Sequence, residues 1–195
     1  GATEEFTAAT VFSQITEGQL FFNSTTNTFK ETITDLGAGS WASGANINTA
    51  REGTAGAGDS AEAALLVGGY TTSSPTVRVA NTESWNGSSW TETTEFNTAR
   101  DNAGNAGSTP AAIIFGGNNG PPFIGNTEVW NGSAWTEVND MNTARENFGS
   151  AAKGTTTATL AFGGLEPAYS AKTESWDGTN WTEVNDLNTA RNSLG

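Results

Sequence analysis

A four-residue motif, Asn-Thr-Ala-Arg, occurs four times in the chain, and no other feature of the sequence limits the fold as strongly. The four copies end at Arg51, Arg100, Arg145 and Arg191, so successive arginines are separated by 49, 45 and 46 residues. Self-similarity at a period of 20 to 50 residues is typical of repeat proteins, in which each unit buries its apolar face against its neighbours. We therefore divide the chain into units at about 51–99, 100–144 and 145–190.

The same order of signals runs between successive motifs. A stretch of small residues leads to an apolar run that ends in a double glycine, and a variable loop and the pattern T-E-[SV]-W-[ND]-G-x-x-W-T-E follow. The double glycines are Gly68 and Gly69, Gly116 and Gly117, and Gly163 and Gly164. The tryptophans are Trp41, Trp85, Trp90, Trp130, Trp135, Trp176 and Trp181, and all seven belong to the repeat.

Each unit predicts four short strands and no helix. The small-residue stretch, the apolar run, T-E-[SV]-W and W-T-E are each too short for a helix and lack helical periodicity. The Asn-Gly or Asp-Gly pair between the last two predicts a tight type I′ hairpin turn. Four antiparallel strands in a unit of this length predict a blade of a β-propeller, with the small residues near the central axis, where backbones approach closely.

At about residues 40–195 the sequence resembles kelch repeats. The resemblance rests on the apolar run with its double glycine, the spaced aromatic residue, the Trp a few residues later and the terminal Arg. One departure is Trp at 85, 130 and 176, where kelch repeats more often carry Tyr. The resemblance implies an all-β, kelch-type β-propeller over residues 37–195, an incomplete ring of about three full four-stranded blades plus partial blades. We expect further strands in a longer protein to complete the ring; a native mass close to 20 kDa would instead require closure by oligomerisation.

Residues 1–36 do not fit the repeat. Within them, residues 17–31 predict a strand, a polar turn and a second strand, and they resemble a short hairpin found in phage tail-fibre and other virion appendage proteins. The resemblance implies an N-terminal attachment segment that joins other virion or tail proteins. In a second interpretation, residues 28–33 supply an outer blade strand; the two interpretations are compatible.

The composition excludes several kinds of chemistry. Histidine and cysteine are both absent, which excludes disulfides, thiolate or imidazole zinc sites and nucleophiles that depend on either residue. The net charge of −13 argues against binding to nucleic acid. The longest apolar runs fall far short of the ~20 residues of a membrane span, so we expect no membrane insertion. The N-D-[ML]-N segments at 139–142 and 185–188 lack the spacing of a calcium loop, and we expect no metal and no cofactor.

The charged residues of the repeat have two interpretations. The arginines either pair with the repeat glutamates Glu83, Glu128 and Glu174, or they form a cluster that grips a carboxylate, as in propeller sialidases. Recurrence in every unit favours the structural pairing, because an active site needs dissimilar residues at one place. Carboxylates that follow the outer Trp are expected on the water-facing rim, where they favour solubility over catalysis: Glu92, Glu95, Glu137, Asp140, Glu183 and Asp186.

The loops after the double glycines are the most variable parts of the repeat, at 70–80, 118–125 and 165–171. Each contains one aromatic residue, Tyr70, Phe123 or Tyr169, which either binds a sugar face or packs on a neighbouring blade. We therefore expect a non-enzymatic, extracellular virion appendage protein, such as a tail fibre, that recognises a host surface glycan or protein. The alternatives are a bacterial surface adhesin or interaction scaffold, and a carbohydrate-active enzyme whose catalytic residues lie outside this segment. A homo-oligomer is compatible with each.

Overall fold

The computed structural model describes residues 20–23, 28–31, 43–72 and 76–194, which fall into two units, Gly1–Ser43 and Gly44–Gly195. In the first unit, β1 (Leu20–Asn23) pairs antiparallel with β2 (Thr28–Glu31). This pairing confirms the two predicted strands, and the predicted turn between them lies outside the described residues. The rest of the proposed attachment segment at 1–36, and Trp41, lie outside the described residues.

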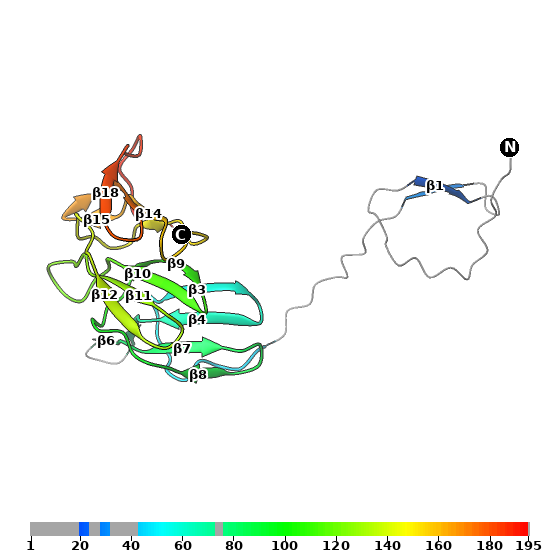
Figure 1. The fold of residues 1–195 in the computed structure, drawn as a ribbon, viewed down its shortest axis with the longest axis horizontal. Coiled ribbons are helices and arrows are strands. Elements are labelled where there is room, and N and C mark those ends of the chain that lie inside the picture. The colour runs from blue at the N-terminus through cyan, green and yellow to red at the C-terminus, as the bar shows by residue number, and fades with distance from the viewer. Residues whose placement is uncertain (1–19, 24–27, 32–42, 73–75, 195) are drawn as a thin grey trace. The chain divides into compact units, whose positions relative to one another are not determined.

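The second unit contains three four-stranded antiparallel sheets, one for each sequence repeat (Figure 1). Sheet I consists of β3 (Ala55–Ser60), β4 (Ala63–Val67), β7 (Thr82–Trp85) and β8 (Trp90–Glu92). Sheet II consists of β9 (Gly104–Ser108), β10 (Ala111–Phe115), β11 (Thr127–Trp130) and β12 (Trp135–Val138). Sheet III consists of β13 (Gly149–Ser150), β14 (Thr159–Phe162), β17 (Thr173–Trp176) and β18 (Trp181–Val184).

Neighbouring strands in each sheet follow the chain order of the four predicted segments, so the prediction of four strands per repeat is confirmed. The described residues contain no helix, and none of their sheets closes on itself. Two small hairpins stand apart from the main sheets, β5 (Tyr70–Thr71) with β6 (Val77–Arg78), and β15 (Leu165–Glu166) with β16 (Ala168–Tyr169). The chain is therefore all-β over its described residues.

Two apolar cores hold the sheets together. One joins sheet I to sheet II and contains Leu65, Val67, Phe96, Ile114 and Trp135. The other joins sheet II to sheet III and contains Ile113, Phe115, Met141, Phe148, Ala161 and Trp181. Alternate residues of β10 thus face opposite neighbours, which explains why its run of apolar residues is continuous. The first strands β3, β9 and β13 lie beside one another, which accounts for their small residues.

The hairpin between the last two strands of each sheet differs from the predicted type I′ turn. It has four residues between paired tryptophans, as in 86–89 between Trp85 and Trp90. Gly87 has a φ of 91°, but Asn86 does not have the positive φ that a type I′ turn requires at both central residues. Instead, the Asn86 Oδ1 atom accepts hydrogen bonds from the backbone N–H groups of Ser88 and Ser89. The prediction of a type I′ turn was wrong because this side chain stabilises a longer loop.

The double glycine is required by both its conformation and its neighbours. Gly116 has a φ of 61°, and a Cβ atom there would lie 3.0 Å from the Arg145 carbonyl oxygen. The next residue, Gly117, donates its N–H to the same oxygen at 2.9 Å. Equivalent bonds join Gly69 to Arg100 and Gly164 to Arg191. The double glycine therefore lets the backbone of the next Asn-Thr-Ala-Arg motif, which follows the last strand of the same sheet, pack closely against it.

Candidate functional site: the loops after the double glycines

The scaffold beneath the loops is built on a repeated ion pair between consecutive sheets. The chain leaves sheet I, and its next arginine, Arg100, reaches Glu128 in sheet II, with 3.0 Å between Nη2 and Oε1. Arg145 pairs in the same way with Glu174 at 3.0 Å, and both side chains in each pair are fully buried. Arg51 pairs with Glu83. The predicted structural pairing of arginines with repeat glutamates is confirmed for these three.

The rest of the motif completes the coordination of each glutamate. Asn97 donates its backbone N–H and its side-chain amide to the Glu128 Oε2 atom at 2.7 and 2.9 Å, and the Thr98 N–H donates to Oε1 at 3.3 Å. Asn48 makes the same two bonds to Glu83. The motif is thus a carboxylate-binding loop, which we call the glutamate clamp.

Burial and pairing act in opposite directions on the charges of the clamp. Burial lowers the pKa of the Arg100 guanidinium, and the nearby Glu128 carboxylate partly offsets that effect. Burial alone would raise the pKa of the Glu83 carboxyl, but hydrogen bonds from Asn48 and Arg51 outweigh it and hold that pKa below its ordinary value. These groups are held ionised in fixed positions, as a structural role requires.

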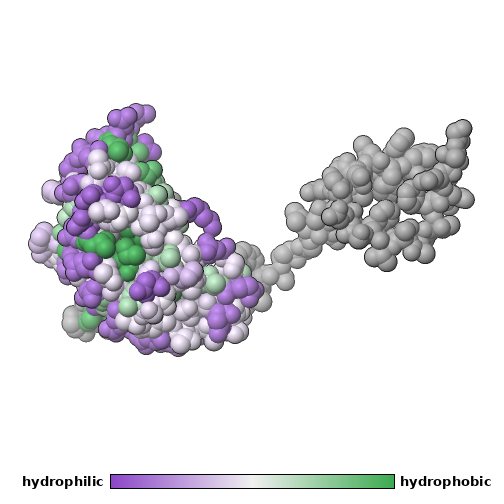
Figure 2. All heavy atoms as spheres, viewed as in Figure 1, coloured by the Kyte–Doolittle hydropathy of each residue, from purple (hydrophilic) through white to green (hydrophobic). Residues whose placement is uncertain are grey.

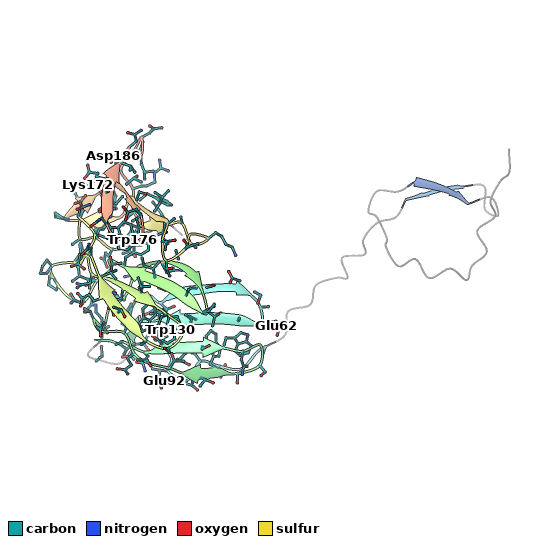
Figure 3. All side chains as sticks on the ribbon, viewed as in Figure 1. Glu62, Glu92, Trp130, Lys172, Trp176 and Asp186 are labelled. Carbon is teal, nitrogen blue, oxygen red and sulfur yellow. The ribbon has the colours of Figure 1, made fainter. Side chains whose placement is uncertain are left out.

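The tryptophans form a second link between sheets. The Trp135 indole Nε1 atom in sheet II donates to the Thr82 hydroxyl in sheet I at 3.1 Å, and Trp181 in sheet III donates to Thr127 in sheet II at 3.0 Å. Within each sheet the two tryptophans face each other across the hairpin, with ring centroids 5.4 Å apart. Figure 3 shows Trp130 and Trp176 within the sheets, and Glu92 and Asp186 at the periphery.

The three variable loops start from equivalent points on this scaffold. The first residue of each loop, which directly follows the double glycine, forms a β-bridge with the residue after a motif arginine. The bridges are Glu52 with Tyr70, Asp101 with Asn118, and Glu146 with Leu165. Because the anchors are equivalent, the loops leave their sheets at equivalent positions despite their different sequences.

Polar side chains at these anchors join the first two loops to the next repeat. Arg78 in the first loop pairs with Asp101 at 2.7 Å. Asn118 in the second loop donates to Glu146 at 2.9 Å. Asn102 donates to both carboxylates, at 3.3 and 3.4 Å. The bases of these two loops are therefore fixed by contacts between neighbouring repeats.

Sequence reasoning missed these anchoring carboxylates. A signal was present, because the residue after the motif arginine is acidic in three of four copies, as Glu52, Asp101 and Glu146. Asp101 and Glu146 are buried, at 4% and 8% exposure, whereas Glu52 is exposed. The Tyr70 hydroxyl donates a hydrogen bond to Glu52, and this bond raises the pKa of that tyrosine.

The predicted loop aromatics have different environments. Tyr169 is 64% exposed, whereas Tyr70 and Phe123 are partly buried. Tyr70 lies against the turn at Gly53, where its ring would be 3.1 Å from an added Cβ atom. Apart from 73–75, all three loops are described, and Val77 adds a second exposed apolar side chain at 49%. Tyr169 and Val77 thus offer apolar surface to a partner, while Tyr70 also packs on its own repeat.

A hollow of about 360 Å³ lies where the turns after the motif arginines meet, and its lining includes Thr54, Asn102, Asn147 and Ser193. Backbone hydrogen bonds connect these turns in series. Asn102 donates to the Gly53 carbonyl, Asn147 to that of Asn102, and Ser193 to that of Asn147, at 2.9, 3.3 and 2.8 Å. Equivalent turns from four successive repeats therefore stack beside one hollow.

The carboxylates predicted to face water do so. Glu92, Glu95, Glu137, Asp140, Glu183 and Asp186 are all exposed. Across the part of the chain that the structure describes, no group of three or more acidic residues is placed to hold a metal ion. No helix in that part is long and apolar enough to cross a membrane. Figure 2 shows a mostly hydrophilic face with apolar residues confined to small patches.

Comparisons with known proteins leave the family open. No protein-family model matches the chain, and no curated protein matches it.

Proposed function

We propose that this chain is a non-enzymatic host-recognition component of a virion appendage, such as a phage tail fibre, in which a kelch-type β-propeller serves as the adhesion scaffold. The observation that carries the proposal is the contrast between identical sheet-to-sheet links and different loops. The glutamate clamps and tryptophan links recur with the same atoms, while the loops at 70–80, 118–125 and 165–171 differ in sequence and in secondary structure. Binding residues on a rigid scaffold are typically found in such loops.

The propeller assignment is supported by the way in which the repeats meet. Each sheet has four antiparallel strands in chain order, its small-residue first strand lies next to those of its neighbours, and the turns before these strands stack beside one hollow. Four-stranded sheets arranged radially with their first strands innermost define a propeller.

The chemistry of the loops suits a glycan or protein surface. Tyr169 presents an exposed aromatic ring of the kind on which a sugar face stacks, and Val77 adds apolar area. The loops also carry exposed amides, such as Asn119, which can bond to hydroxyl groups. The repeat arginines are engaged within the scaffold in sheets I to III, so they do not form an anion-binding cluster there.

Binding of the full chain to host-cell glycans on an array, or to whole cells, tests the adhesion role. The Tyr169→Ala variant, alone and combined with Phe123→Ala and Tyr70→Ala, is expected to weaken binding at least tenfold. Thr136→Ala, at an exposed position on β12, is the control and should bind normally. Unchanged binding by the triple variant, with an unchanged melting temperature, would refute the loop assignment.

Mass spectrometry of purified phage particles tests the virion role. The proposal expects peptides of this chain in intact particles and their loss when tail fibres are removed. If the peptides were found only in the cell-surface fraction of bacteria, the result would contradict the virion role and support a bacterial surface adhesin.

A further inference from the structure

Sheet III has a face that no described residue covers. Three apolar residues on it occupy positions that are buried in the preceding repeats. Leu160 is 38% exposed, whereas its equivalents Ile113 and Leu65 are 0% and 2% exposed. Phe162 and Leu187 are likewise partly exposed, whereas their equivalents in sheet II, Phe115 and Met141, are buried at 0% and 6% exposure.

A buried hydroxyl group on this face has no hydrogen-bond partner among the described residues. Thr173 is the equivalent of Thr82 and Thr127, whose hydroxyls accept hydrogen bonds from the tryptophan of the next sheet. Thr173 is only 8% exposed, yet within the described part of the chain its Oγ1 atom forms no hydrogen bond. A buried polar atom of this kind is costly unless something bonds to it. In this scaffold the group that bonds to the equivalent hydroxyl is an indole N–H.

No described glutamate occupies the last clamp on this face. Residues 188–191 repeat the Asn-Thr-Ala-Arg motif, but Arg191 is exposed and, among the residues described, its side chain bonds only to the Thr189 carbonyl oxygen. Its backbone is nevertheless in the position of the other clamps, because the Arg191 carbonyl accepts the Gly164 N–H at 2.8 Å. The clamp is therefore positioned to receive a glutamate.

We infer that the uncovered face of sheet III is a docking surface for a further repeat of the pattern T-E-x-W-[ND]-G-x-x-W. Its glutamate binds Asn188, Thr189 and Arg191, its second tryptophan donates to the Thr173 hydroxyl, and its apolar second strand covers Leu160. This inference does not depend on the adhesion role, since it follows from the sheet-to-sheet contacts alone.

A second copy of sheets I to III does not fit this surface. Glu83, Glu128 and Glu174 are each held by a clamp of their own chain. In sheet I of a second copy, the Trp90 indole has no described acceptor. The glutamate of that sheet, however, is already bound by Asn48 and Arg51. The partner must therefore present its glutamate free, which distinguishes an additional repeat from a copy of the described ones.

A chain extended by one repeat tests the inference. A second copy of residues 150–195 is placed directly after Gly195, which continues the 46-residue spacing from Arg145 to Arg191. We expect a thermal midpoint several degrees higher and protection of the added strands from hydrogen exchange, because each added interface contributes to the stability of a repeat array. The control extension carries Gln in the copied position of Glu174 and Phe in that of Trp181.

The substitution Thr173→Val separates docking from a general effect of added length. In the original chain it should leave the midpoint unchanged or raise it, because it removes an unpaired hydroxyl. In the extended chain it should lower the midpoint by about 2–4 °C, because a hydrogen bond is lost.

Three results would overturn the inference. These are equal effects of Thr173→Val in both chains, an unprotected added repeat, and equal midpoints for the extension and its control. A concentration-dependent dimer of the original chain that Thr173→Val abolishes would also overturn it, in favour of self-association.

Discussion

The substitution Glu128→Gln tests whether the glutamate clamp is a main source of stability. Glu128 is fully buried and accepts four hydrogen bonds, from Arg100, from Thr98 and two from Asn97. Glutamine keeps the volume of the side chain but supplies one acceptor oxygen and one NH₂ donor. Whichever way its amide is turned, the NH₂ group faces N–H donors.

The size of the expected loss of stability follows from the contacts that Arg100 keeps after the substitution. Its guanidinium is fully buried, and its Nε and Nη1 atoms already have no acceptor, so the Glu128 carboxylate is the acceptor on which it depends. Removing one partner of a buried ion pair costs about 3–5 kcal/mol. The face of Phe96, 5.3 Å from the guanidinium carbon, remains as a weak interaction worth about 0.5–2 kcal/mol. We therefore expect a net loss near 3 kcal/mol and a thermal midpoint lower by on the order of 10 °C.

Urea unfolding followed by tryptophan fluorescence measures this change, because all seven tryptophans lie in the repeats. Glu95→Gln is the matched control, since Glu95 is exposed and should change the free energy of unfolding by no more than about 0.5 kcal/mol. A loss for Glu128→Gln that is indistinguishable from the control would show that the clamp contributes no net stability.

Two further substitutions and one titration examine other parts of the scaffold. Gly116→Ala should lower the free energy of unfolding by about 1–2 kcal/mol or more, because it places a Cβ atom at positive φ and 3.0 Å from the Arg145 carbonyl oxygen. The control Gly56→Ala, whose Cβ atom would have its nearest contact at 3.5 Å, should lower it by less in the same urea assay. Trp181→Phe should remove one indole hydrogen bond and lower the free energy of unfolding by at least about 1 kcal/mol, measured by calorimetry. Because the folded pKa of Glu83 lies below its ordinary value of 4.5, its contribution should be complete above pH 4.5 and should disappear as the pH falls through the folded pKa. Glu83→Gln should therefore flatten the acid limb of a stability profile.

The strands and the ion pairs were predictable because each has a local signal that recurs. Four short segments, each bounded by glycine or turn residues, recur in every unit, and the structure forms a strand from each. The Arg–Glu pairing could be inferred since both residues appear once per unit, and repetition implies a repeated structural contact. The sequence could not show that Arg100 pairs with Glu128 of the following sheet, because that depends on how the chain crosses between sheets.

Other features depend on contacts that have no local pattern. The hairpin turn was mispredicted because Asn86 can stabilise a turn either by its backbone conformation or by its side chain. Here its side chain accepts hydrogen bonds from Ser88 and Ser89, and the dipeptide Asn-Gly does not distinguish the two cases. Burial of Asp101 and Glu146 follows from loops of neighbouring repeats that reach over them. Those loops have unrelated sequences, so their partners could not be matched in advance.

The distribution of charge explains how the loops can vary without loss of the fold. The pairs Arg100–Glu128 and Arg145–Glu174 are buried and make the same contacts in successive repeats, so a substitution there disturbs two sheets together. Loop residues such as Tyr169 are exposed and contribute little to either apolar core, so their replacement should leave the scaffold intact. Three exposed glutamates lie on the outer strands and three exposed carboxylates follow them, and there mutual repulsion acts through water and favours solubility. Under the proposed adhesion role, stability and recognition depend on separate sets of residues, and the substitution of Tyr169 should change binding while the unfolding midpoint stays constant.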